Sequence, residues 1–177
     1  ISFSKQSIGS AQNQKERAIS LYYAVRDGIK YNPYTLTFDI NDYKASAVLS
    51  KKEGFCVQKA VLLAAAARAC HIPALLGFAD VRNHLSSRRL RNILQTDMFY
   101  FHGYVQLYIE GKWVKATPAF DAALCEKLQI FPLEFDGEHD SIFHPFDREG
   151  NVHMEYVRDH GSFTDLPFDM MIDTIRS

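Results

Sequence analysis

The sequence of 177 residues is poor in cysteine and tryptophan, with three cysteines and a single tryptophan. Cys56, Cys70 and Cys125 are too few for a disulfide framework and leave one thiol unpaired. A reducing compartment, the cytoplasm, is therefore the expected location. The first residue is Ile1 rather than methionine, which is typical of a processed N-terminus.

Long apolar runs and an excess of charge are also missing. The longest apolar run, Val61–Ala67, is far too short to cross a membrane. The net charge is −1 at pH 7, so neither nucleic acid nor an anionic membrane surface is an expected partner. No cofactor is indicated by the sequence, and the oligomeric state stays open.

The sequence does contain enough apolar material for a packed core, with 47% hydrophobic and 13% aromatic residues. The length fits one domain, residues 1–177, and no linker or repeat divides it. Apolar periodicity predicts helices at residues 11–30, 56–70 and 122–128, and strands at 74–77, 103–109 and 112–116. Residues 31–43 are expected to be irregular and 83–95 to form an exposed helix or loop, and the chain after residue 131 shows no clear period.

The segment 56–70 is the clearest of these helices. It is rich in alanine, the best helix former, and it is apolar nearly all round, which is typical of a helix buried on most sides. Pro73 cannot continue the helix. His71 stands where a residue in the left-handed conformation commonly ends a helix.

Cys56 opens this buried helix, and Gly54 precedes it by two residues. The unpaired amides of a helix N-terminus stabilise a thiolate, so we expect a lowered pKa at Cys56. The same amides can hold the oxyanion of a tetrahedral intermediate, and Gly54 would let a substrate backbone approach closely. The alternative is that Cys56 is a small apolar core residue, the usual role of a free cysteine.

His102 stands at the start of the strand 103–109, in which apolar residues alternate with polar ones. A histidine at the rim of a sheet is well placed to reach the N-terminus of a helix that packs on the sheet. The alternative is a structural histidine with no catalytic role.

The two segments together resemble the transglutaminase-like superfamily. Residues 54–60 (Gly-Phe-Cys-Val-Gln-Lys-Ala) and 67–74 (Ala-Arg-Ala-Cys-His-Ile-Pro-Ala) are similar to the nucleophile segment of the family. Residues 102–108 (His-Gly-Tyr-Val-Gln-Leu-Tyr), followed by a glycine turn and Trp113-Val114, are similar to its histidine hairpin. The resemblance covers roughly residues 14–118, within a core motif region of about 14–121.

The resemblance implies an α+β fold of the papain-like, transglutaminase-core type. In that fold N-terminal helices and a buried nucleophile helix pack on an antiparallel sheet. It also implies cysteine-dependent acyl transfer, in which the Cys56 thiolate attacks a carboxamide or peptide carbonyl and His102 acts as the base. The expected substrate is a protein or peptide with an amide group. Transamidation, deamidation and hydrolysis stay open, and the alternative function is a non-catalytic peptide-binding or scaffolding module.

The sequence departs from the family pattern at the residue that orients the histidine. The family has an aspartate four residues after the hairpin tryptophan, and this chain has Thr117 there. If Glu110-Gly111 is the turn, Thr117 lies diagonal to His102 on the same face of the hairpin. Asp121 is the competing candidate, and its alternative role is the N-cap of the helix 122–128.

No metal site is expected. Four histidines near the C-terminus lie among acidic residues, but their spacing matches no zinc pattern and no EF-hand loop. We expect them to lie in solvated loops: His139, His144, His153 and His160.

Overall fold

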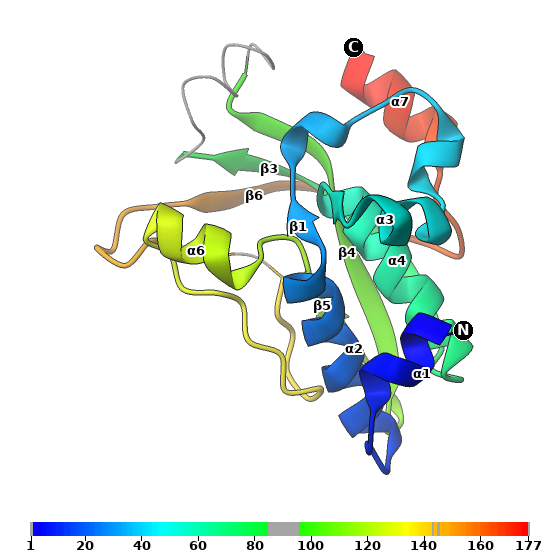
Figure 1. Ribbon diagram of the computed structural model, residues 1–177. Coiled ribbons are helices and arrows are strands. Elements are labelled where there is room, and N and C mark those ends of the chain that lie inside the picture. Colours follow the sequence, from blue (N-terminus) through cyan, green and yellow to red (C-terminus); the bar gives the residue numbers. More distant parts are fainter. Residues whose placement is uncertain (1, 85–95, 143, 145, 177) are drawn as a thin grey trace.

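The computed structural model describes residues 2–84, 96–142, 144 and 146–176 (Figure 1). The first part of the chain is mostly helical: α1 (Ser2–Ile8), α2 (Gln14–Gly28), the 3-10 turns η1 (Pro33–Thr35) and η2 (Ile40–Tyr43), α3 (Ala45–Lys51) and α4 (Cys56–Ala69), with the short strands β1 (Lys30–Tyr31) and β2 (Glu53–Gly54) between them. The second part forms a sheet and two helices: β3 (Ala74–Asn83), β4 (Met98–Ile109), β5 (Lys112–Ala116), α6 (Ala122–Leu128), β6 (Met154–Phe163) and α7 (Phe168–Arg176).

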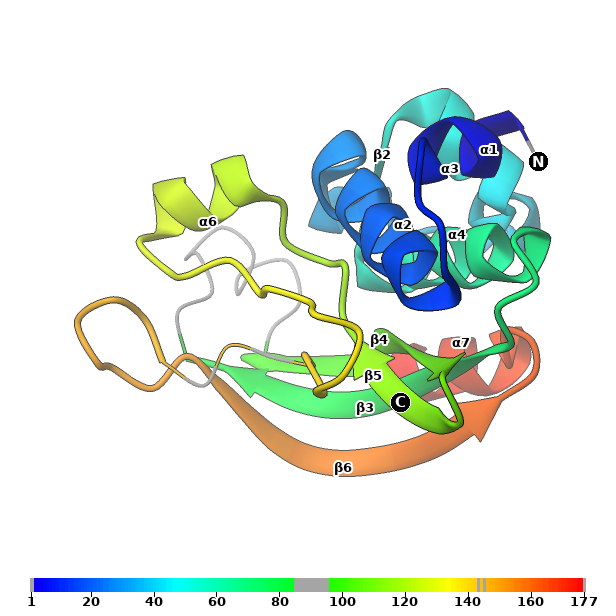
Figure 2. The ribbon, with the colours of Figure 1, turned by 90° about the horizontal axis from the view of Figure 1, so that it is seen from below.

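The four long strands form one antiparallel sheet in the order β5-β4-β3-β6. Figure 2 shows α2 and α4 on one face of this sheet, with α1 and α3 beyond them. Residues of α4 are buried between the other helices and the sheet, as the nearly all-round apolar pattern of the sequence predicts. The predicted α+β architecture, with the helix of Cys56 packed on an antiparallel sheet, is confirmed.

The end of α4 has the geometry that the sequence predicts. His71 has φ of 59°, and its N–H donates to the carbonyl of Arg68 at 3.0 Å. The N–H of Ile72 donates to the carbonyl of Ala67 at 3.0 Å, which completes a left-handed cap. The cap reverses the chain direction, so β3 begins five residues after α4 ends and packs against α4.

The hairpin of β4 and β5 also has the predicted register. Glu110 and Gly111 both have positive φ, 49° and 91°, as a two-residue hairpin turn requires, and Ile109 pairs with Lys112. Strand β4 is longer than the predicted strand 103–109, since it already begins at Met98. Phe101, with φ of 54°, lies at a register shift between β3 and β4, and this irregularity breaks the alternation that would reveal the first part of the strand.

Lys59 joins α4 to α2. Its side chain is fully buried, and Nζ donates to the carbonyls of Arg26 at 2.8 Å and Ile29 at 2.5 Å. These are carbonyls at the end of α2, which have no partner inside their own helix. Burial lowers the pKa of Lys59 to about 7.

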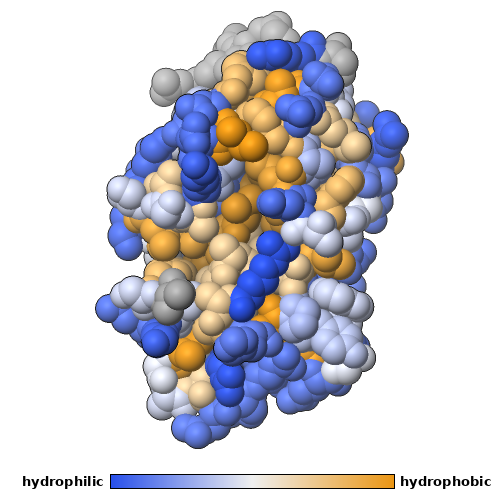
Figure 3. Space-filling view, turned by 90° about the vertical axis from the view of Figure 1, so that its right-hand side faces the viewer, coloured by the Kyte–Doolittle hydropathy of each residue, from blue (hydrophilic) through white to orange (hydrophobic). Residues whose placement is uncertain are grey.

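The chain after residue 131 is more regular than its sequence suggests. Strand β6 lies at the edge of the sheet, where half-exposed side chains weaken the alternation, and α7 buries only Met171 and Ile172. Figure 3 shows the side of the molecule on which α7 lies, where apolar residues are exposed between hydrophilic ones. Most of the predicted exposed helix or loop at 83–95 falls in 85–95, outside the described residues.

All three cysteines are free and buried. Among the helices that the structure describes, none is both long and apolar enough to cross a membrane.

Candidate active site

Cys56 is the first residue of α4, and Gln58 fixes the position of this helix N-terminus. The Oε1 atom of Gln58 accepts from the backbone N–H of Phe55 at 3.1 Å and from the hydroxyl of Thr35 at 2.8 Å. Its Nε2 atom donates to the carbonyl of Asp42 at 3.1 Å. Gln58 therefore ties the first turn of α4 to both 3-10 turns. We did not predict this role, although a glutamine three residues after an N-cap is half of the capping-box pattern.

Gly54 makes room for Gln58 rather than for a substrate. A Cβ atom at Gly54 would lie 3.1 Å from both Cβ and Oε1 of Gln58, closer than side chains normally pack. The expectation that Gly54 lets a substrate backbone approach is therefore wrong, because the side chain of Gln58 already fills this space.

Gly103 brings the two sequence motifs together. It lies in β4 against the first turn of α4, and a Cβ atom there would be 3.0 Å from Cα of Val57 and 3.3 Å from the carbonyl oxygen of Cys56. A side chain at this position would press on the helix backbone, so the strand or the helix would have to shift by a few tenths of an ångström. Because Gly103 directly follows His102, the close contact places the histidine segment beside the helix N-terminus that carries Cys56.

The Cys56 thiol is buried, with 4% of the residue exposed. Burial raises its pKa to about 11, although hydrogen bonding from the backbone of Gly103 and Val57 lowers it. The lowered pKa that the sequence predicts from the helix N-terminus is therefore wrong for the substrate-free site. The helix amides act in the expected direction, but the loss of water around the sulfur outweighs them.

His102 is buried as well, with 4% of the residue exposed. Burial, and then the neighbouring His153, lowers its pKa to about 4. Its Nδ1 atom is buried and has no hydrogen-bond partner in the described part of the chain. The hydrogen bonds found among the described residues do not include one between the Cys56 thiol and the His102 ring. The resting site thus holds a neutral thiol and a neutral imidazole.

Thr117 points its hydroxyl at the backbone of a neighbouring segment. Its Oγ1 atom donates to the carbonyl of Ile142 at 2.5 Å, and its N–H donates to the carbonyl of Ser141 at 2.8 Å. The pairing of β5 with β4 ends at Ala116 and Val105. The chain leaves β4 there and follows residues 141–142 instead, so the hairpin does not extend to Thr117.

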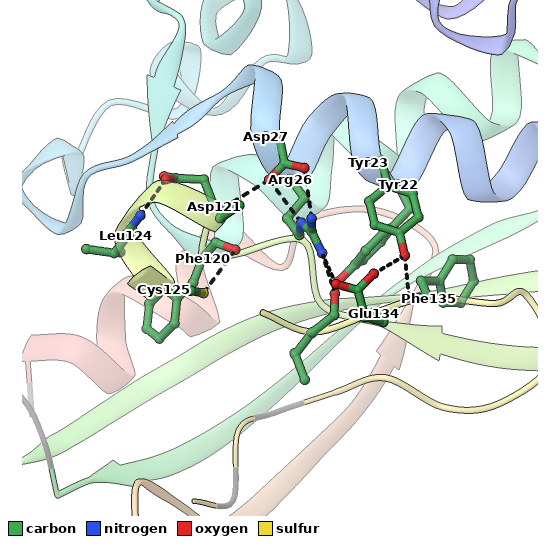
Figure 4. A network of polar contacts seen from close by, with 12 residues as sticks. Tyr22, Tyr23, Arg26, Asp27, Phe120, Asp121, Leu124, Cys125, Glu134 and Phe135 are labelled. Carbon is green, nitrogen blue, oxygen red and sulfur yellow. Dashed lines mark hydrogen bonds and ion pairs between the residues drawn. The ribbon is translucent and has the colours of Figure 1, made fainter. Parts of the chain in front are cut away.

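Asp121 is the N-cap of α6, the alternative that the sequence offers for it. Its Oδ1 atom accepts from the N–H of Leu124 at 2.9 Å, and Oδ2 accepts from the N–H of Tyr31 at 2.8 Å. Figure 4 shows this cap beside Arg26 and Asp27 of α2. The N–H of Ala122 also donates to Asp27 at 3.0 Å, so the start of α6 is held to α2. Both oxygens of Asp121 are used in these contacts.

An apolar pocket of about 120 Å³ opens beside Cys56. Its walls come from β1 and η1, from the start of α4, from the start of β4 and from α7. Among the described residues, none of the side chains in these walls carries a charge. The principal apolar side chains are Tyr31, Leu36, Phe55, Met98, Phe99 and Ile175.

Residues 1–118 match the family described as the transglutaminase-like superfamily. This match covers well over half of the chain. The chain belongs to the transglutaminase-like superfamily. No curated protein is significantly similar to it in sequence.

Two solved structures are similar to this chain. One is a candidate cysteine protease from Cytophaga hutchinsonii, with 14% identity, a TM-score of 0.52 and coverage of 90% of this chain. The other is a candidate protease from Parabacteroides distasonis, with 16% identity, a TM-score of 0.46 and coverage of 65% of this chain. The chain spans 48% and 22% of the lengths of these two proteins, respectively.

Two parts of this transglutaminase-like chain lie beyond the matched residues and next to the candidate site: one lines the pocket with Cys56, and the other lies near His102. One is α7. The other is a pair of buried histidines, His144 and His153, whose rings stack on Phe120 with centroid distances of 5.5 and 6.1 Å. Burial lowers the pKa of His144 to about 3 and that of His153 to about 4.

The prediction of solvated loops is wrong for these two histidines and also for His160, which lies in β6 with its Nε2 atom 2.8 Å from Oδ1 of Asp80. His153 is 1% exposed, and one ring nitrogen each of His144 and His153 is buried with no hydrogen-bond partner among the residues that the structure describes. Neither lies in a periodic segment of the sequence, so no pattern signals their burial. Within the described part of the chain, no group of three or more His, Cys, Asp or Glu residues is arranged to hold a metal ion.

Proposed function

We propose that this chain catalyses cysteine-dependent acyl transfer from an amide or peptide carbonyl, with Cys56 as nucleophile and His102 as base. The observation that carries the proposal is the contact of Gly103 with the first turn of α4, which sets the His102 segment beside Cys56. Family membership and the pocket that reaches Cys56 support it.

In this reaction the thiol and imidazole begin neutral. His102 takes the thiol proton as the sulfur forms a bond to the carbonyl carbon, and the oxyanion lies near the helix N-terminus. The imidazolium then gives its proton to the leaving nitrogen as the carbon–nitrogen bond breaks, which leaves a thioester on Cys56. Water or an amine then attacks the thioester while His102 takes the proton of the attacking group. The carbon–sulfur bond breaks and the imidazolium returns its proton to the sulfur, which releases the acid or the new amide and restores the thiol.

An activated ester tests this proposal without knowledge of the natural substrate. We would incubate the protein with p-nitrophenyl acetate, quench in acid and map acetyl groups by mass spectrometry. The expected result is an acetyl group on Cys56, steady release of p-nitrophenolate, and a rate that falls at least about 100-fold in His102→Ala, because general base catalysis contributes about 10²–10⁴-fold. Hydroxylamine should capture the acetyl group as a hydroxamate.

The matched control is Cys70→Ala, which removes the thiol at the opposite end of the same helix and should leave the rate unchanged. An acetyl group that appears first on Cys70 or Cys125, or equal rates in the native protein and His102→Ala, would overturn the proposal.

A non-catalytic module is the second candidate, and one observation favours it. Among the described residues, the Nδ1 atom of His102 has no hydrogen-bond partner, and the side chains of both Thr117 and Asp121 form their hydrogen bonds with other groups. A histidine base is normally oriented by an acceptor at this nitrogen, and its loss lowers the rate of the reaction that the ring assists. If p-nitrophenyl acetate leaves Cys56 unmodified while peptides still bind beside it, the module is the better description.

A further inference from the structure

We propose that the pocket beside Cys56 binds an apolar side chain of the substrate, of the size of leucine, and that Ile175 of α7 sets this size. The inference rests on the proposed function, because it takes Cys56 as the atom that the substrate carbonyl must reach. It goes further by naming the class of acyl donor: a peptide or amide whose acyl residue carries a branched aliphatic side chain.

The first argument is the chemistry of the walls. Aromatic and aliphatic side chains form most of the pocket, and the described residues add no charge to it. Such a surface favours an apolar group over a charged or amide side chain, since a buried polar group without a partner costs about 1–3 kcal/mol. A glutamine carboxamide, which needs hydrogen bonds at both its oxygen and its nitrogen, is therefore a poor occupant.

The second argument is volume. An apolar cavity of about 150 Å³ holds a benzene molecule, whereas one water takes about 30 Å³ of liquid volume. The pocket measures about 120 Å³. It therefore suits an isobutyl group and is small for an indole.

The third argument is that α7 is firmly held where Ile175 lines the pocket. Met171 and Ile172 lie in the hydrophobic core, and Phe168 contacts Tyr43 edge-on with a centroid distance of 5.3 Å. At the other end of the helix, the guanidinium of Arg176 lies 4.5 Å from the ring centroid of Phe38. Ile175 is thus a fixed wall, and it belongs to a helix outside the residues that match the family.

Esters that differ in one side chain test the proposal. We would measure kcat/KM for the p-nitrophenyl esters of acetylglycine, acetylleucine and acetyltryptophan. The leucine ester should exceed the glycine ester by at least about tenfold, since even one methylene in an apolar pocket is worth about 10–200-fold. Ile175→Ala should raise the rate with the tryptophan ester relative to leucine, and Ile175→Phe should lower the rate with leucine but not with glycine.

Two controls separate size from stability. Met170→Ala changes a neighbouring side chain of α7 that is 49% exposed and should leave all three ratios unchanged. Ile175→Val changes the wall by one methylene and should shift the leucine to tryptophan ratio slightly in the direction of Ile175→Ala. Because the ratios of substrates are compared within each variant, a partly unfolded fraction cancels.

A second readout does not need turnover. Alkylation of Cys56 by iodoacetamide and by N-isobutyl iodoacetamide, mapped by mass spectrometry, should favour the isobutyl reagent in a way that depends on Ile175. Ester turnover with equal rates for glycine and leucine would contradict the proposed binding of a side chain in the pocket, but it would not contradict the proposed acyl transfer. Selective alkylation without any ester turnover would support the proposed binding in the pocket and contradict the proposed acyl transfer.

Discussion

Thr117 shows how a single hydroxyl separates a catalytic from a structural role. Its Oγ1 donates to the carbonyl of Ile142. Thr117→Val removes the donor at similar volume and leaves that carbonyl unpaired, so unfolding should become easier by about 1–3 kcal/mol. The kcat/KM per folded molecule should stay within about twofold, because a group that does not touch the base adds nothing to proton transfer.

Thermal midpoints and ester rates measured together decide this prediction, with Thr117→Ser as the variant that keeps the hydroxyl. A tenfold loss of rate in Thr117→Val at an unchanged midpoint would mean that the hydroxyl orients His102 after all.

Asp121 gives a prediction of a different kind, because both of its oxygens accept from backbone N–H groups, of Leu124 and of Tyr31. Asparagine caps a helix as well as aspartate does. Its amide, however, offers one acceptor, so Asp121→Asn should lose one of the two bonds and about 1 kcal/mol of stability. Urea unfolding and ester hydrolysis would check this. Full stability with a large loss of rate is the result that the structure does not allow.

At the scale of single residues, the sequence predicts where Cys56 and the His102 segment lie, but it does not predict whether their side chains are ionised. The pattern of glycine, cysteine and alanine-rich helix identifies a helix N-terminus, and the contact at Gly103 agrees with it. The pKa of Cys56 depends on how much of the molecule covers the sulfur, and no local pattern carries that information. The same holds for the two histidines on Phe120.

At the scale of elements, predictions were accurate where one residue type or one period dominates. The strand at 112–116 and the helix at 122–128 appear with the predicted bounds, and α4 ends within one residue of its prediction. Helix α1 and strand β6 were missed because their apolar residues are few or only half covered. The position of α7 is decided by the packing of Met171 and Ile172 in the core, and the local sequence does not carry that information.

The junction of α4 with the two 3-10 turns leads to a prediction about Gln58. Gln58→Leu removes its hydrogen bonds to Phe55, Thr35 and Asp42 and leaves buried backbone groups unpaired, so it should destabilise the fold by about 2–4 kcal/mol. It should also slow alkylation of Cys56, because the helix N-terminus is no longer fixed. Gln58→Glu keeps the acceptor and loses the donor, so its effect should be intermediate. An undiminished alkylation rate in Gln58→Leu would show that the helix start needs no such support.

At the scale of the whole molecule, three buried histidines make stability depend on pH. Burial lowers the pKa of His102 and His153 to about 4 and of His144 to about 3. The unfolded chain binds protons below about pH 6.5, whereas the folded chain does not, so stability is complete above that pH and falls towards pH 4. Each histidine can contribute up to about 3 kcal/mol to this loss.

Urea unfolding at intervals between pH 7 and pH 4.5 measures this effect. His153→Leu should remove about one proton from the slope of stability against pH in this range. A stability that stays flat from pH 6.5 to pH 4.5 in the native protein would mean that these histidines are hydrated in solution.

The most direct test of the central claim, that Cys56 and His102 act as a pair, is the rate of iodoacetamide labelling at each cysteine in the native protein and in His102→Ala. Cys56 borders the pocket. Peptide mapping at pH 7.5 should show Cys56 labelled before Cys70 and Cys125, and at least about tenfold more slowly without the imidazole that takes its proton. Labelling of Cys70 or Cys125 ahead of Cys56, or an unchanged rate at Cys56 in His102→Ala, would contradict the account.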